Sequence, residues 1–121
     1  MRDKLQVTFR GMDPSTFVDT RIEESAAKLF ELESRITGCH VTVEARHRHH
    51  HKGQIFHVCI DLTVPGAEIA VSREPEQDHS HEDVYVAIRD AFDAARRRLL
   101  DHAGRRSRRE EAKIAGAVPT I

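Results

Sequence analysis

The 121-residue sequence contains no tryptophan, one tyrosine and two cysteines, and it has no apolar run near the 18 residues of a membrane helix. The scarcity of aromatic residues argues against a large aromatic ligand pocket. Cys39 and Cys59 lie in strand-like stretches without metal-site spacing, and alternation points Cys39 inward and Cys59 outward. Because a signal peptide is also absent, we predict a cytoplasmic protein with reduced thiols.

The sequence also lacks the motifs of common enzyme classes. It has no Gly-rich loop of the P-loop or dinucleotide-binding type. His57 and Cys59 share a predicted sheet face, but a two-residue spacing does not define a nucleophile, and nothing supplies an oxyanion hole. We therefore predict no enzymatic activity, no cofactor and no small-molecule substrate.

The formal net charge is only −1, but the charges are distributed unevenly. Residues 83–121 hold nine Lys/Arg against six Asp/Glu, whereas residues 1–82 hold ten against fourteen. The stretch from Arg96 to Arg109 holds seven arginines and one acid, Asp101. Local charge sets the field around a protein, so a near-neutral total is compatible with a polyanionic partner.

Alternating apolar and polar residues predict four strands, each with one buried face. The predicted strands are 5–10, 39–47, 56–64 and 68–73. The cationic segment from His47 to Gly53 forms the tip of one hairpin, and Pro65-Gly66 is the turn of the next.

Two amphipathic helices accompany these strands. The first is predicted from Pro14 to Glu33 with Asp13 as its N-cap, and Val18, Ile22, Ala26 and Leu29 point inward. The second begins at Asp83 after the polar loop 74–82, where Ser80 and Asp83 loosely resemble a capping box. Its apolar stripe is Val84, Ile88, Ala91, Phe92, Ala95 and Leu99.

The helical pattern ends at Ala103-Gly104, so we predict one domain over residues 1–104 and a mobile basic tail over 105–121. The element order β-α-β-β-β-α predicts an α+β fold. The first two strands would be parallel neighbours joined by a helical crossover, and the later strands would follow as hairpins. Both helices would cover one face of the four-stranded sheet.

The start of the last helix carries the most specific motif of the chain. Asp83-Val84-Tyr85-Val86-Ala87-Ile88-Arg89-Asp90-Ala91 follows the pattern aspartate–aliphatic–Tyr–x–Ala–Ile–x–x–Ala and precedes a basic helix end. Together with the element order and the strand within GAEIAVSRE (66–74), residues 4–102 resemble the short form of the hibernation-promoting factor and ribosome-associated inhibitor family, also called sigma-54 modulation proteins.

The resemblance implies a fold related to double-stranded-RNA-binding domains and a protein that is monomeric when free. It also implies binding in the channel of the small ribosomal subunit, where messenger and tRNA would sit, so that idle ribosomes in stationary phase or stress are silenced. Its partners would be the small subunit and its rRNA, not a membrane. By position, the RNA contacts would be Lys28 of the first helix and Arg89, Arg96 and Arg97 of the second.

This chain departs from the family in its arginine-rich, rather than lysine-rich, helix end. Ala94 and Ala95 stand near where members often have Lys-Leu. No dimerisation domain follows the first domain, so the resemblance does not imply that this chain pairs ribosomes directly.

The arginine cluster points to RNA independently of the resemblance. One or two arginines at a helix C-terminus are explained by the helix dipole, but seven in fourteen residues exceed that need. Arginine suits bidentate contact with phosphate and stacking on bases. Arg89 and Arg96 project within roughly 20° of each other on an ideal helix, and Arg98 lies close to the apolar stripe and so is partly structural. Arg105 and Arg106 would add long-range attraction.

The His-rich hairpin tip has three open interpretations: a plain polar tip, a contact with RNA or a ribosomal protein, and adventitious metal binding. His47, His49 and His51 would share a face of an extended strand and are weak metal candidates, but a structural zinc site needs four closed ligands. Cationic side chains that favour phosphate over metal are Arg46, Arg48 and Lys52.

Two other function classes remain open from the sequence. A protein-interaction module that regulates transcription would bind its partner regardless of salt or ribonuclease. A His-rich metal-dependent sensor would carry stoichiometric zinc that is lost when His49 and His51 are replaced.

Overall fold

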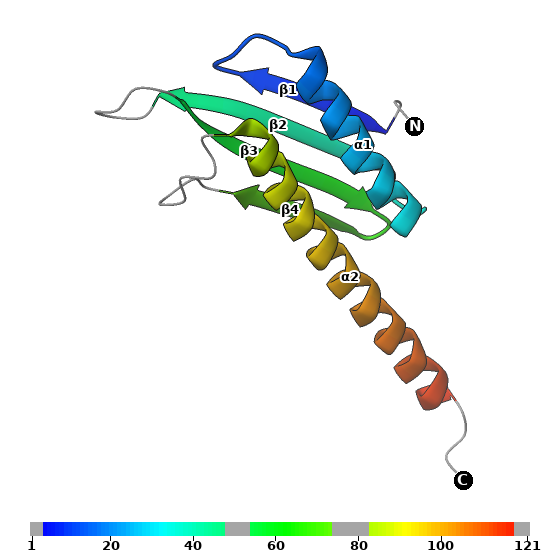
Figure 1. The fold of residues 1–121 in the computed structure, drawn as a ribbon. Coiled ribbons are helices and arrows are strands. Elements are labelled where there is room, and N and C mark those ends of the chain that lie inside the picture. The colour runs from blue at the N-terminus through cyan, green and yellow to red at the C-terminus, as the bar shows by residue number, and fades with distance from the viewer. Residues whose placement is uncertain (1–3, 48–53, 74–82, 118–121) are drawn as a thin grey trace.

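A computed structural model describes residues 4–47, 54–73 and 83–117, and it confirms the predicted α+β fold and its element order (Figure 1). The strands are β1 (Leu5–Arg10), β2 (Gly38–His47), β3 (Gln54–Val64) and β4 (Ala67–Arg73). The helices are α1 (Thr16–Leu32) and α2 (Val84–Ala117). Among the described residues, no helix is both long enough and apolar enough to span a membrane.

The strands form one sheet in the order β1-β2-β3-β4. β1 is parallel to β2, and the other two pairs are antiparallel, as the crossover and the hairpins predict. The register aligns Val7 with Val41, Val41 with Ile60 and Ile60 with Val71. An apolar row therefore crosses all four strands on a single face.

Both helices lie on that apolar face and run in the same direction (Figure 1). α2 contacts β3 and β4, and α1 contacts α2 and β1. The core between the layers includes the fully buried Ile22 of α1, Ile60 of β3 and Ile88 of α2. The opposite face of the sheet carries no helix (Figure 1), and we call it the outer face.

The first helix begins two residues later than the sequence pattern predicts. Ser15, not Asp13, is the N-cap: its backbone is extended (φ −123°, ψ 123°) and its hydroxyl accepts a hydrogen bond from the Val18 N–H at 3.3 Å. Both residues are good N-caps, and either start leaves the same apolar stripe facing inward, so periodicity cannot choose between them. That stripe is buried as predicted.

The last helix continues well past its predicted end. Asp83 caps it, with its carboxylate accepting from the Tyr85 N–H at 2.9 Å. The helix passes through Gly104 to Ala117 and extends beyond the sheet (Figure 1). The helix end predicted at Ala103-Gly104 is therefore wrong. One interior glycine costs a helix only about 1 kcal/mol, and the strong helix formers arginine, glutamate and alanine follow it.

The two cysteines lie as the sequence predicts, whereas two polar segments of the chain are not described by the structure. Cys39 is buried in the core and Cys59 is partly exposed on the outer face, and both are free thiols, as alternation predicts. The tip at 48–53 and the polar loop with Ser80 at 74–82 lie outside the described residues.

Candidate nucleic-acid interface

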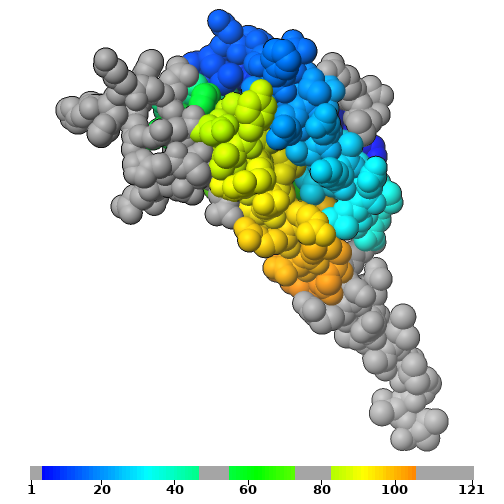
Figure 2. Space-filling view, in the orientation of Figure 1, coloured from blue at the N-terminus to red at the C-terminus, as the bar shows by residue number. Residues whose placement is uncertain are grey.

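A groove of about 320 Å³ runs between α1 and α2 on the side of the helices that faces solvent. The two helices lie side by side along it in the space-filling view (Figure 2). Leu29, Ile88 and Phe92 give it an apolar floor that is continuous with the core. Its polar lining consists of Arg21, Glu24, Ser25 and Lys28 from α1 and Tyr85, Arg89, Asp93 and Arg96 from α2.

Helical spacing brings these side chains to one groove. Arg21 and Lys28 are seven residues apart on α1, and Arg89 and Arg96 are seven apart on α2. Seven residues are about two turns, so each pair projects to the same side of its helix. Because the helices run in the same direction, Lys28 and Arg96 lie further along the groove than the Arg21–Tyr85 end.

The groove has a positive charge balance. Four cations and two acids, Glu24 and Asp93, line it. Arg89 pairs with Asp90 at 3.2 Å, but its side chain is 64% exposed, and such surface pairs contribute little. Within the described part of the chain, Lys28 and Arg96 form no ion pair. These cations are therefore available to an anion from outside.

Tyr85 forms one end of the groove. Tyr85 is 36% exposed, and the guanidinium carbon of Arg21 lies 5.1 Å from its ring centre, within the range of a cation–π contact. The contact joins α1 to α2 across the groove. An aromatic face with a cation above it is a surface on which a planar group can stack.

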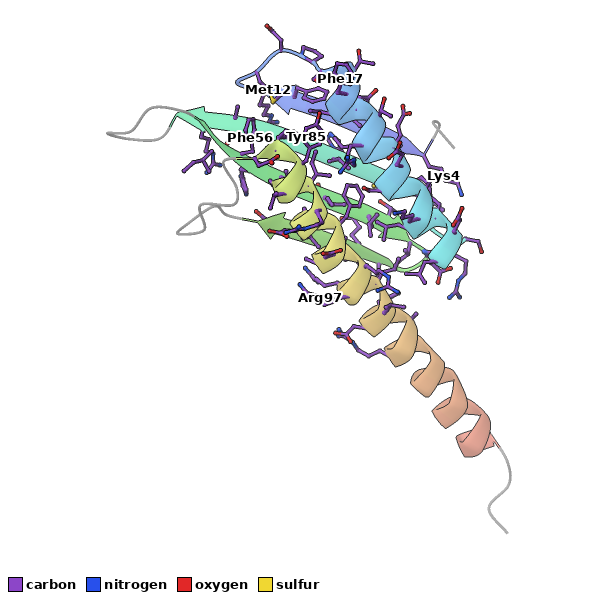
Figure 3. All side chains as sticks on the ribbon, in the orientation of Figure 1. Lys4, Met12, Phe17, Phe56, Tyr85 and Arg97 are labelled. Carbon is purple, nitrogen blue, oxygen red and sulfur yellow. The ribbon has the colours of Figure 1, made fainter. Side chains whose placement is uncertain are left out.

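The structure brings together three of the predicted RNA-contact residues. Lys28, Arg89 and Arg96 all line the groove. Arg97 does not: it is exposed on the side of α2 that faces away from α1 (Figure 3). Arg21 lines the groove but was not among the predicted contacts, although its seven-residue spacing from Lys28 is a signal in the sequence.

The remaining predicted contacts lie elsewhere. Arg46 is on β2, where it donates a hydrogen bond to Glu44. Arg105 is exposed on the extended part of α2, and position 106 continues that helix. Arg48 and Lys52 lie outside the described residues. Arg98, expected to be partly structural, donates to the backbone carbonyl of Ala70 on the edge strand β4.

The metal hypothesis for the His-rich hairpin stays a prediction. Across residues 4–47, 54–73 and 83–117, no group of three or more His, Cys, Asp or Glu side chains could hold a metal ion. His49 and His51 lie outside those ranges, and for His47 only the backbone at the end of β2 is described.

On the outer face, polar side chains bond to one another. Thr8 and His40 are joined at 2.8 Å, and the buried His57 is joined to Ser72 at 2.8 Å. The Cys59 thiol donates to Ser72 at 3.6 Å. The hydrogen bond from Arg46 lowers the pKa of the Glu44 carboxyl below its ordinary value. These polar groups therefore satisfy one another within the protein.

A second hollow, of about 610 Å³, lies between β1 and the start of α1. Leu5, Val7 and Phe9 contribute its apolar lining, and its charged residues are Asp19 and Glu23. A hollow whose charges are both negative repels phosphate. The groove between the helices is therefore the better candidate for a polyanion.

These features define a two-layer α+β domain with a cationic groove between parallel helices on one side of its sheet. The family model of the sigma-54 modulation protein / S30EA ribosomal protein family matches residues 5–107. The chain belongs to this family, which confirms the resemblance carried by the motif at Asp83 to Ala91. No curated protein matches the chain.

Two solved structures share the fold. One is described as a ribosomal subunit interface protein from Coxiella burnetii; it has a TM-score of 0.66 at 17% identity over 83% of this chain and 97% of the other. The other is the N-terminal domain of Protein Y from Thermus thermophilus, with a TM-score of 0.57 at 18% identity over 78% of this chain and 91% of the other. At these identities the similarity shows the fold alone, and function rests on the family and the groove.

Proposed function

We propose that this protein is a ribosome-associated translation inhibitor, a hibernation factor that binds the small ribosomal subunit and blocks messenger and tRNA binding in idle ribosomes. The observation that carries the proposal is the groove, where Arg21, Lys28, Arg89 and Arg96 converge from two helices. Family membership supports a ribosome-associated role. The description of the Coxiella burnetii structure as a ribosomal subunit interface protein is consistent with it.

The proposed contact is mainly electrostatic. Lys28 acts as a point charge, and the arginines offer forked donors that match phosphate oxygens. Structured RNA presents phosphates and shape more readily than base edges. A small domain with fixed cations can thus recognise the geometry of an rRNA surface without reading sequence. Occupation of the subunit channel by the domain would exclude messenger and tRNA sterically.

The test is co-sedimentation with purified small subunits after reversal of two groove charges, Lys28→Glu with Arg96→Glu. Hydrogen bonds to charged groups contribute roughly 1.5–3 kcal/mol each, so losing both should weaken binding by about a hundredfold or more. Both side chains are exposed, so the thermal unfolding of the variant should match that of the wild type.

The matched control is Lys4→Glu with Arg10→Glu, which reverses two exposed cations outside the groove. We expect this control to bind at close to the wild-type level in moderate salt, because overall charge alone is screened beyond about 10 Å at 0.1 M. Equal losses in both variants would contradict the groove as the binding surface. A toeprinting or tRNA-binding assay on the same subunits then tests the blocking step.

A further inference from the structure

We propose that the groove between α1 and α2 holds one unpaired nucleotide of its RNA partner, with the base stacked on Tyr85 and the flanking phosphates bound by Lys28, Arg89 and Arg96. This inference rests on the proposed function and deepens it. The proposed function needs only cations that face phosphate. A nucleotide site also needs a flat apolar surface for a base, and the groove supplies one.

The first support is the division of the groove into two kinds of lining. One end holds the partly exposed Tyr85 with the guanidinium of Arg21 over its ring, and the buried side chains of Ile88 and Phe92 lie along the floor. The other end holds Lys28 and Arg96. Tyr85 and Arg96 are eleven residues, about three helical turns or roughly 16 Å, apart on α2, so the phosphates that reach Lys28 and Arg96 belong to the strand that flanks the stacked nucleotide. A nucleotide has the same division, with an apolar base face and an anionic phosphate.

The second support is the small volume of the groove, together with the need for a base whose face is uncovered. The groove volume of about 320 Å³ is at the lower end for sites that enclose small molecules. In a duplex, each base has its faces covered by neighbouring pairs and cannot present one to Tyr85. Single-stranded loops and bulges, in contrast, can splay their bases onto aromatic or guanidinium planes. The groove therefore favours an unpaired nucleotide over a duplex.

Arg21 is the group that adjusts when the base enters. It covers the Tyr85 ring at 5.1 Å from the ring centre, and it is exposed on a long stem. Its guanidinium can move aside and bind a phosphate, or stack on the second face of the base. Either position replaces one cation–π contact with stacking and keeps the cation at the site.

The two acids in the groove fit a base better than a phosphate. Glu24 and Asp93 repel phosphate, but their carboxylates can accept hydrogen bonds from an exocyclic amino group, as carboxylates do with the amino group of cytosine. A short oligocytidine strand is therefore a suitable probe. The phosphates would lie on the cations that flank the acids.

The chain carries its own reporter for this test. Tyr85 is the only tyrosine, and there is no tryptophan, so the intrinsic fluorescence of the protein comes from the proposed stacking surface. Titration with a four-nucleotide cytidine strand, corrected for absorption by the strand, should quench this fluorescence to saturation. A strand of the same length with abasic residues retains the phosphates, and we expect it to bind roughly tenfold more weakly and to quench little, because stacking supplies about 1–3 kcal/mol per base.

Variants separate stacking from other roles of the ring. Binding of an end-labelled strand, followed by anisotropy, should be retained in Tyr85→Phe and weakened about tenfold in Tyr85→Ala. The matched control is Phe17→Ala, which removes an aromatic side chain that is 80% exposed on α1 and does not line the groove. Binding by this control should equal that of the wild type.

The outcomes distinguish this inference from the proposed function. Equal binding of the abasic and the cytidine strands would overturn the nucleotide site. Ribosome binding through phosphates would stand in that case. If instead the cytidine strand stacks on Tyr85 but reversal of Lys28 and Arg96 leaves co-sedimentation with small subunits unchanged, the nucleotide site stands and the proposed function fails.

Discussion

The two sides of the sheet use their polar side chains in opposite ways. On the outer face, Thr8 bonds to His40, His57 to Ser72, and Arg46 to Glu44. On the helix side, Lys28 and Arg96 reach the groove with no ion pair among the described residues. The presence of charged residues alone would not distinguish these two surfaces, because both contain arginine.

The difference shows that availability, not the number of cations, marks a candidate binding surface. A cation already bonded to a neighbouring carboxylate must lose that bond before it contacts phosphate, and the exchange yields little free energy. A cation held beside others by a packed helix pair has already incurred the repulsion that an external anion relieves. Three predictions test the contrast between the two faces, beginning with the largest expected effect.

The largest difference between the faces should be in stability. Ile60 points into the core and is fully buried, whereas the next residue, Asp61, is exposed on the outer face. Ile60→Ala should lower the free energy of unfolding by about 2–5 kcal/mol because it removes buried methyl groups and leaves a cavity. Asp61→Ala should change it by about 0.5 kcal/mol or less. Urea denaturation measures both, and similar values would contradict the assignment of the core to one face.

The buried Cys39 should have an intermediate effect on stability, and this effect depends on pH. Burial, with a smaller contribution from the charge of Asp61, raises the pKa of the Cys39 thiol to about 12 from an ordinary value near 9. The unfolded chain therefore loses this proton first, and stability should fall as pH rises from about 9 towards 12.

The free energy of unfolding should fall by about 2 kcal/mol between pH 8 and pH 10.5, because each pH unit above pH 9 costs roughly 1.4 kcal/mol. Urea denaturation at the two pH values measures it, and Cys39→Ala should remove this part of the pH dependence. A Cys59→Ala variant, altered on the outer face, should retain it. An unchanged slope in Cys39→Ala would show that other groups cause the loss.

The smallest effect concerns the ion pair of the outer face. The hydrogen bond from Arg46 is the main cause that lowers the pKa of Glu44. Stability from this group is present above its unfolded pKa and is lost as pH falls through the lower folded pKa. Arg46→Ala should shift the Glu44 titration, followed by carboxyl NMR, back towards its ordinary value, and should cost less than about 1 kcal/mol at pH 7. A larger loss would mean that this face contributes more to stability than its exposure indicates.

Most of the fold was predictable because periodicity depends on burial. Inward positions such as Val18, Ile22 and Ile60 recur at helical or strand spacing because one face of each element must leave water. The positions at which helices begin and end were harder to predict. Asp13 and Ser15 differ little as caps, and the penalty at Gly104 is small against the helix formers around it.

The candidate site was predictable only in part, because it joins two elements. Lys28, Arg89 and Arg96 could be carried over by position from the family resemblance, and all three meet in the groove. Arg97 is one residue from Arg96, but 100° of helical rotation directs it to another surface. The role of Arg21 depends on the packing of α1 against α2, which places it over Tyr85. Arg21 and Tyr85 belong to different helices, and no spacing pattern in the sequence links them.

The parallel pairing of β1 with β2 has a consequence for how the domain opens. β3 and β4 are joined by a tight turn at Pro65-Gly66, but Leu5 meets Cys39 only across the whole α1 crossover. Closing that longer loop costs more entropy, and β1 lies at the edge of the sheet with a hollow beside it. We therefore expect the backbone amides of β1 to exchange with solvent through local opening while β2, β3, β4 and α2 stay folded. This local opening would begin at the first strand, on the far side of α1 from the cationic groove.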